Sequence, residues 1–171
     1  MDNIITESGM DFIADNTFHI ERSPLYTNIK GIKTVEFIRA KGNDLILVEA
    51  KKTFPRPDDD PNAKERGRFE TALKEICEKF VHSLNLYSSV KVGVRETQLP
   101  EDFLPPDKVT LIFVLVLKDL KQEWRRPIQT ALNMVLPPYV RKIWKPTVLV
   151  INHDFAITQN LANNHTQIAE D

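Results

Sequence analysis

The run VTLIFVLVL, Val109 to Leu117, is the feature of the sequence that most limits the possible folds. Its residues are almost all apolar and do not alternate with polar ones, which predicts a central strand buried on both faces. Such a strand needs a layer of structure on each side of its sheet. The run is also far too short to cross a bilayer. We therefore expect a sheet protein with covered faces and no membrane partner.

Two helices are predicted, one on each side of this run along the chain. Apolar residues spaced by three and four predict an amphipathic helix from about 62 to 88, with Asp60 as N-cap and Pro61 at its first position. The segment LKQEWRRPIQTALNMVL predicts a second helix, which ends at Pro137-Pro138. Trp124, in this second helix, and Trp144 are interpreted as packing residues rather than as platforms for base stacking.

Four further segments are predicted strands: TFHIERSPLY, IKTVEFIRA, DLILVEAKK and PTVLVIN. The resulting order is three strands, helix, strand, helix and strand. This order predicts a single α/β domain over residues 1–171, with a mixed central β-sheet flanked by helices. Residues 1–16 are weakly patterned and suggest a short helix. We expect this N-terminal stretch, and the polar tail from about 160 to 171, to be weakly ordered.

The segment TVEFIRAKGNDLILVEAKK, Thr34 to Lys52, predicts a hairpin that carries a pair of acids. Gly-Asn between two apolar runs is a strong turn signal. A two-residue loop there places Glu36 opposite Glu49, with their Cβ atoms about 4.5–5.5 Å apart. Lys51 leaves the same face of the sheet two residues beyond Glu49. A loop of odd length would instead put the two acids on opposite faces.

Two facing carboxylates repel each other by roughly 3 kcal/mol at about 5 Å, with an effective dielectric near 20. A buried pair therefore needs a shared proton, basic neighbours or a metal ion, and Mg²⁺ or Mn²⁺ can bind oxygens from both acids. Lys51 beside them can hold or deprotonate a water, or stabilise charge on a phosphate. The alternative is a solvated strand end, in which Glu49 contacts Lys51 and no function is present.

An acid on one strand, followed by acid-x-Lys on the next strand and then a long helix, resembles the PD-(D/E)XK nuclease superfamily, which has the restriction-endonuclease-like fold. The matching residues are Val35-Glu36 and Glu49-Ala50-Lys51, and the order of elements matches over roughly residues 17 to 117. The resemblance implies hydrolysis of phosphodiester bonds in nucleic acid, DNA rather than RNA, with Mg²⁺ or Mn²⁺. It implies that Glu36, Glu49 and the Ala50 carbonyl bind the metal, and that Lys51 positions or activates the attacking water.

The sequence departs from the superfamily motif at two positions, because Glu36 stands in place of the usual Asp and Val35 in place of Pro. Many members add an upstream glutamate to the site. Glu21 is the better placed candidate, with Glu7 as the second, and the alternative interpretation of Glu21 is a surface strand residue. The first predicted helix offers two further polar candidates for the site, Glu70 and Lys74.

Composition bears on partners and compartment. Lys plus Arg total 23 and Asp plus Glu total 24, so the net charge of −1 gives no signal for nucleic acid, and any basic surface must be local. The single cysteine, Cys77, is interpreted as a core residue, and the N-terminus lacks a secretory signal, so we expect a cytoplasmic protein.

Two alternatives to an independent nuclease remain open. One is a non-enzymatic binding or scaffolding module that keeps a nuclease-like fold. The other is a subunit that depends on a protein partner, or on a second copy of itself, to find its substrate.

Overall fold

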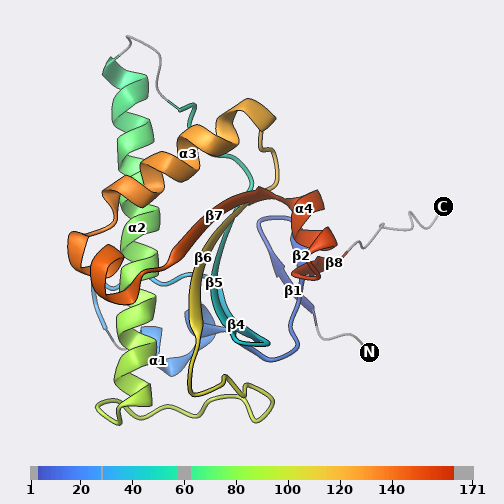
Figure 1. The fold of residues 1–171 in the computed structure, drawn as a ribbon, viewed down its shortest axis with the longest axis vertical. Coiled ribbons are helices and arrows are strands. Elements are labelled where there is room, and N and C mark those ends of the chain that lie inside the picture. Colours follow the sequence, from blue (N-terminus) through green and yellow to red (C-terminus); the bar gives the residue numbers. More distant parts are fainter. Residues whose placement is uncertain (1–3, 28, 58–62, 164–171) are drawn as a thin grey trace, which may run out of the picture.

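The computed structural model describes residues 4–27, 29–57 and 63–163 of the chain. At its centre is a five-stranded sheet (Figure 1). The strands lie in the order β3 (Thr17–Phe18), β4 (Phe37–Lys41), β5 (Asp44–Lys51), β6 (Thr110–Leu117) and β7 (Thr147–Asn152). The first three strands pair antiparallel and the last three pair parallel. The predicted mixed α/β class is therefore confirmed.

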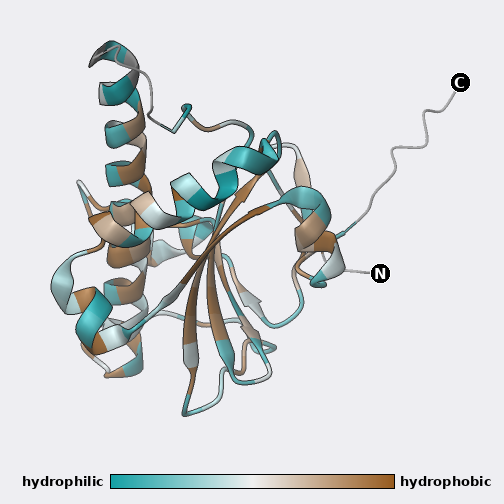
Figure 2. Ribbon diagram, turned by 45° about the horizontal axis from the view of Figure 1, so that its top comes forward, coloured by the Kyte–Doolittle hydropathy of each residue, from teal (hydrophilic) through white to brown (hydrophobic). Residues whose placement is uncertain are grey.

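The strand β6 lies between β5 and β7 and is parallel to both. All of its residues are buried except Thr110 and Ile112. Figure 2 shows apolar residues running along the strands of this sheet. The prediction of a central strand buried on both faces is thus confirmed, and the apolar run of the sequence forms the middle of the core.

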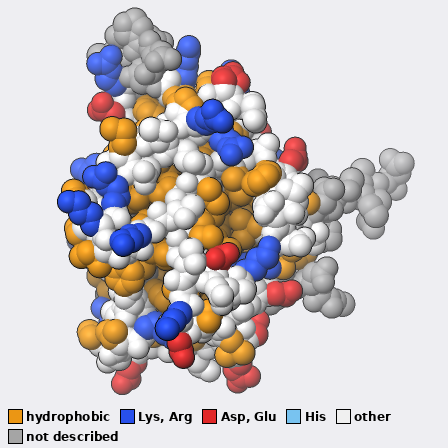
Figure 3. All heavy atoms as spheres, in the orientation of Figure 1, with side chains coloured by type: hydrophobic (Ala, Val, Ile, Leu, Met, Phe, Trp, Pro, Cys, Tyr) orange, Lys and Arg blue, Asp and Glu red, His pale blue; other side chains and the backbone are white. Residues whose placement is uncertain are grey.

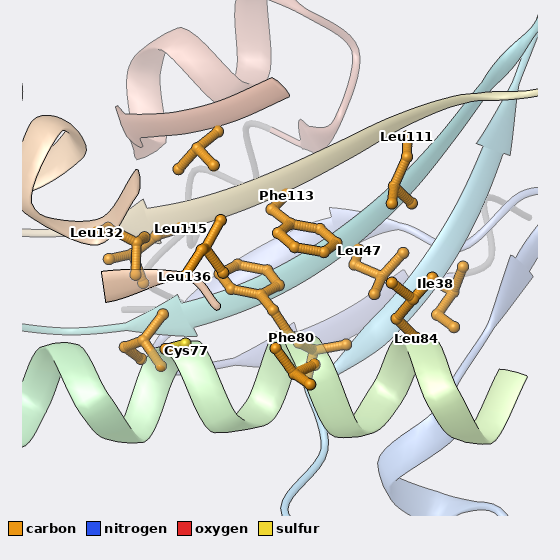
Figure 4. Packing of buried hydrophobic residues seen from close by; sticks show 14 of the residues in the cluster. Ile38, Leu47, Cys77, Phe80, Leu84, Leu111, Phe113, Leu115, Leu132 and Leu136 are labelled. Atoms are coloured by element: carbon orange, nitrogen blue, oxygen red, sulfur yellow. The ribbon is translucent and has the colours of Figure 1, made fainter. Parts of the chain in front are cut away.

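Helices cover one face of the sheet. The long helix α2 (Ala63–Lys91) connects β5 to β6, and α3 (Gln122–Val135) with the π-helical turn η2 (Val140–Trp144) connects β6 to β7. The rings of Phe80 on α2 and Phe113 on β6 stack with centroids 4.6 Å apart and an interplanar angle of 6° (Figure 4). Both predicted helices are present, and Cys77 is buried in this layer. The proposed cap residues Asp60 and Pro61 lie outside the described residues.

The opposite face is covered mainly by strands, where we expected helices. A small sheet of β1 (Ile4–Glu7), β2 (Met10–Ile13) and β8 (Ala162–Asn163) packs there, with only one short helix, α4 (His153–Thr158). The helix predicted within residues 1–16 is wrong, because Ser8 and Gly9 adopt φ of 53° and 70° and turn the chain into a hairpin. Part of the predicted C-terminal tail forms β8, and residues 164–171 lie outside the described part.

The first predicted strand is correct only at its start. After the two-residue strand β3, a 3₁₀ turn η1 (Ile20–Arg22) and a short helix α1 (Pro24–Thr27) follow. The Ser23 hydroxyl donates a hydrogen bond to the Ile20 carbonyl at 2.7 Å, which holds this turn. As a result, Glu21 lies on a turn beside the sheet and not on a strand, which matters for the site.

Apolar side chains remain exposed in a hollow between α4 and the loop that joins β4 to β5 (Figure 3). The hollow has a volume of about 660 Å³, and residues of β6, β7 and α4, among them Ile112, Leu149 and Phe155, line it. Among the described helices, none combines the length and the apolar character that crossing a bilayer requires.

Candidate functional site

Glu49 lies near the carboxyl end of β5 and is fully buried, with 0% of its surface exposed. One of its oxygens, Oε1, accepts a hydrogen bond from Lys79 Nζ at 2.7 Å and lies 3.2 Å from Lys51 Nζ. Lys51 therefore lies on the same face as Glu49, as the strand geometry predicts. Burial raises the pKa of Glu49, and the two ammonium groups oppose that rise.

Glu36 immediately precedes β4, and the register of the hairpin decides where it lies. The predicted two-residue loop is present, because Lys41 pairs with Asp44 and the ladder continues to Phe37 opposite Val48. The ladder then ends, and the N–H of Glu36 donates to the carbonyl of Val48 at 3.1 Å. Glu36 and Phe37 thus both oppose Val48, as in a β-bulge. The predicted ladder pair between Glu36 and Glu49 does not form, although the two groups remain within electrostatic reach.

The carboxyl group of Glu36 is strongly perturbed. Burial, a hydrogen bond with the Glu21 side chain and the negative charges of Glu49 and Glu21 raise the pKa of Glu36 to about 9, against the weaker opposing effect of Lys79. In the absence of a cation, Glu36 is therefore protonated at neutral pH and supplies the proton of its hydrogen bond. The sequence suggested a proton shared by Glu36 and Glu49 as one possible compensation, whereas the hydrogen-bond partner of Glu36 is Glu21.

Lys79 is the functional residue that the sequence interpretation missed. Its side chain is only 12% exposed, and although burial lowers its pKa, the hydrogen bond to Glu49 and the negative charges of Glu49, Glu36 and Glu21 together raise the pKa above its usual value. The candidates proposed on this helix, Glu70 and Lys74, are exposed instead and take part in none of the contacts described at the site. A lysine between the buried residues Ile76 and Phe80 was the available signal, because an amine on an apolar face needs a partner.

The helix α2 also positions the segment that leads into Glu36. Ser83, one turn after Lys79, accepts a hydrogen bond from the backbone N–H of Val35 at 2.8 Å. His82 Nδ1 accepts another from the N–H of Lys33 at 3.1 Å. Because these two bonds fix the chain just before β4, the same helix that supplies Lys79 also holds Glu36 against β5.

A second group of potential ligands adjoins the acid pair. One ligand atom each from Glu7, His19 and Glu21 lies within 4.8 Å of the others, a spacing that suits a metal ion. His19 Nε2 lies 3.4 Å from Glu7 Oε1, and Arg22 donates to the same oxygen at 3.0 Å. Both upstream glutamates suggested by the sequence therefore lie in one cluster. The hydrogen bond from Glu36 to Glu21 joins this cluster to the pair.

The tip of the β1–β2 hairpin closes this end of the sheet. The Ser8 hydroxyl donates to the Ala50 carbonyl at 3.0 Å, and Lys118 Nζ donates to the Gly9 carbonyl at 2.7 Å. A carbonyl oxygen has a second lone pair, so Ala50 keeps one acceptor position besides the bond from Ser8. The hairpin brings Glu7 to the site in this way. The sequence named Glu7 as a candidate but suggested a helix here, so the hairpin itself was not expected.

Each of the two buried acids has one carboxylate oxygen without a partner in the described part of the chain. Glu36 Oε2 and Glu49 Oε2 are buried and make no hydrogen bond to any residue that the structure describes. Leaving a buried acceptor unpaired costs about 1–3 kcal/mol, and more for a charged group. Carboxylate and carbonyl oxygens are the ligands that Mg²⁺ and Mn²⁺ prefer. Glu36, Glu49 and the Ala50 carbonyl therefore offer oxygens of the type that a hard divalent cation binds.

Two further groups of acidic or histidine residues stand in the sequence, His153-Asp154 and the run Asp58 to Asp60. His153 and Asp154 open the short helix α4, which Asn152 caps by accepting from the Phe155 N–H at 2.8 Å. Asp58 to Asp60 lie outside the described residues. The chain shows no significant match to any protein-family model, curated protein or solved structure.

Proposed function

We propose that this chain is a metal-dependent phosphodiesterase that acts on nucleic acid, with DNA preferred over RNA, and that it is a divergent member of the PD-(D/E)XK superfamily. The observation that carries the proposal is the pair of unpaired, buried oxygens on Glu36 and Glu49, with the Lys51 ammonium 3.2 Å from Glu49. A bulge before β4, two buried acids and a partly exposed amine at the carboxyl end of β5 form an arrangement that structural stability alone does not require.

Glu36, Glu49 and the Ala50 carbonyl would hold the ion, with Glu21 as a neighbouring oxygen donor. A bound Mg²⁺ or Mn²⁺ supplies Lewis-acid stabilisation of charge on a phosphate and lowers the pKa of a bound water. Glu36 must give up its proton to bind a cation, so ion binding at this site is expected to be stronger at higher pH.

The two lysines have different tasks. Both contact Oε1 of Glu49, which leaves Oε2 as the oxygen available to a ligand. Lys79 is largely buried and fixes the carboxylate, whereas the side chain of Lys51 is 34% exposed and can reach substrate. Lys51 would orient the attacking water or stabilise the developing negative charge on the phosphate.

The adjacent residue provides a matched control for this assignment. Lys51→Ala should abolish Mn²⁺-dependent cleavage of a DNA substrate while the melting temperature changes little, because Lys51 is at the surface end of its ion pair. Lys52→Ala removes the next lysine, which is exposed and follows the end of β5, and this variant should retain activity. Glu49→Ala should also abolish cleavage. Wild-type rates in both the Lys51 and the Glu49 variants would contradict the mechanism.

A non-enzymatic module is the second candidate, and one observation favours it. Glu49 is already balanced by two lysines, and Glu36 is kept neutral by its raised pKa, so the acids are tolerated without an ion. The melting temperature with and without Mn²⁺ separates the two candidates. A binding site should stabilise the fold by RT ln(1 + [L]/Kd). If Mn²⁺ leaves the melting temperature of the wild type unchanged, the scaffold is the better description.

A further inference from the structure

A cavity of about 760 Å³ lies between the start of α2, the start of α3 and the segment that follows β5. Its walls include the aromatic residues Phe69 and Trp124 and the cations Arg56 and Lys121. The Lys121 ammonium lies 4.7 Å from the centroid of the Trp124 ring. Trp124 packs against the core, as the sequence suggested, and its partly buried side chain also lines this open pocket.

The pocket lies along the same edge of the molecule as the candidate site. Phe69 and Lys79 are ten residues apart on α2, which corresponds to about 15 Å along the helix. On the other side, Arg56 follows Lys51 by five residues, and the Asp119 N–H donates to the Lys52 carbonyl at 2.9 Å. This bond ties the chain just before α3 to the chain just after β5, so the pocket is built on the exit of the strand that carries Glu49.

The chemistry of the walls matches one kind of ligand. Phe69 is braced by Phe54 in an edge-on contact with centroids 6.0 Å apart, so the aromatic wall is supported from behind. A partly exposed tryptophan ring with two cations in the same lining suits a nucleobase and the phosphates next to it. Glu123 on the same wall repels a phosphate and can accept a hydrogen bond from a base. In a duplex the faces of the bases are stacked on one another, so only an unpaired base can enter.

We propose that this pocket binds a nucleotide of a single nucleic-acid strand, whose scissile phosphate lies at the Glu36–Glu49 site. This inference rests on the proposed function and adds the form of the substrate. At the axial rise of about 3.4 Å per nucleotide in a stacked strand, the 15 Å along α2 corresponds to about four nucleotides, and to fewer in an extended strand. The pocket therefore sets how many nucleotides lie between the base that it holds and the phosphodiester bond that is cut.

The test measures binding of 12-nucleotide single strands, one of DNA and one of RNA, in EDTA so that no hydrolysis takes place. In a Trp144→Phe background, Trp124 is the sole tryptophan, and stacking of a base should quench its fluorescence. Trp124→Leu should weaken binding of a labelled strand by about 5- to 100-fold. Arg56→Gln and Lys121→Gln should each reduce the slope of log K against log salt by about 0.7. Lys142 is an exposed cation on η2, so Lys142→Gln is the matched control and should change neither the binding affinity nor the salt slope.

Each outcome decides the proposal. Quenching by either strand, lost in the pocket variants and kept in the control, supports it and shows which sugar is accepted. Equal quenching by a blunt duplex, or unchanged binding by Arg56→Gln and Trp124→Leu, overturns it. Arg56 is exposed, so its variant remains informative if the Trp124 variant fails to fold. Because binding is measured without a cation, failure of cleavage in Mn²⁺ counts against the proposed function and leaves the binding result interpretable.

Discussion

Glu36→Gln tests the electrostatics of the site directly, because it replaces the perturbed carboxyl by an uncharged side chain of similar shape. The fold raises the pKa of Glu36 to about 9, against an ordinary value of 4.5. Between these two pH values the folded chain binds one more proton than the unfolded chain, so the free energy of unfolding falls as pH rises. The slope is at most about 1.4 kcal/mol per pH unit. From pH 6.5 to 8.5 the free energy of unfolding of the wild type should therefore fall by about 2–3 kcal/mol, and that of the Glu36→Gln variant should not show this fall.

Urea unfolding of both proteins in EDTA, at several pH values in this range, measures the difference in slope. The m-values should agree, so that the comparison reports stability and not a change in compactness. Glu70→Gln, on the exposed side of α2, is the control and should follow the wild type. At pH 8.5 the Glu36→Gln variant should be the more stable protein, yet it should no longer be stabilised by Mn²⁺. Parallel pH profiles for the wild type and Glu36→Gln would refute the reasoning, because the raised pKa would then have no energetic consequence.

Two further predictions concern how α2 holds the site. Lys79→Met leaves the buried Glu49 carboxylate with only one cation and should destabilise the fold by roughly 3 kcal/mol. Lys51→Met should cost less than about 1 kcal/mol, because the ammonium group of Lys51 is partly solvated. Thermal or urea unfolding compares the two variants, and equal losses of stability would contradict the different tasks assigned to the two lysines. Ser83→Ala leaves the buried Val35 N–H unpaired and should cost about 1–3 kcal/mol, while Ser89→Ala, whose hydroxyl bonds within its own helix, should cost clearly less in the same assay.

The elements that could be predicted from the sequence are those whose signals are local. The Gly42–Asn43 loop needs a positive φ at its glycine, and the observed value of 58° explains why this dipeptide predicts the hairpin and its register. The length and composition of the run from Val109 to Leu117 predict a buried central strand in the same way. The spacing of apolar residues on α2 gives its extent to within a few residues. Because side chains alternate along a strand, the shared face of Glu49 and Lys51 follows from the extent of β5 alone.

The elements that could not be predicted depend on contacts between distant segments. The pair Ser8-Gly9 is a weak turn signal between two four-residue strands, and these strands are stable only because they pack on the open face of the main sheet. The strand that begins at Thr17 ends at Phe18, and nothing local shows that the turn Ile20–Arg22 then carries Glu21 to Glu36. The bulge at Glu36 likewise depends on Ser83, which lies 48 residues from Val35 in the chain.

The position of Lys79 explains how the two acids remain buried near each other although they do not form a ladder pair. Had Glu36 and Glu49 faced each other directly in a regular hairpin, both carboxylates would have shared one environment. The bulge separates them instead, so that Glu49 meets the lysines and Glu36 meets Glu21. One acid is held charged and the other neutral, and each keeps one free oxygen. At the cation site that we propose, binding of a divalent ion would exchange one proton, which requires less rearrangement than separating two ionised carboxylates that repel each other.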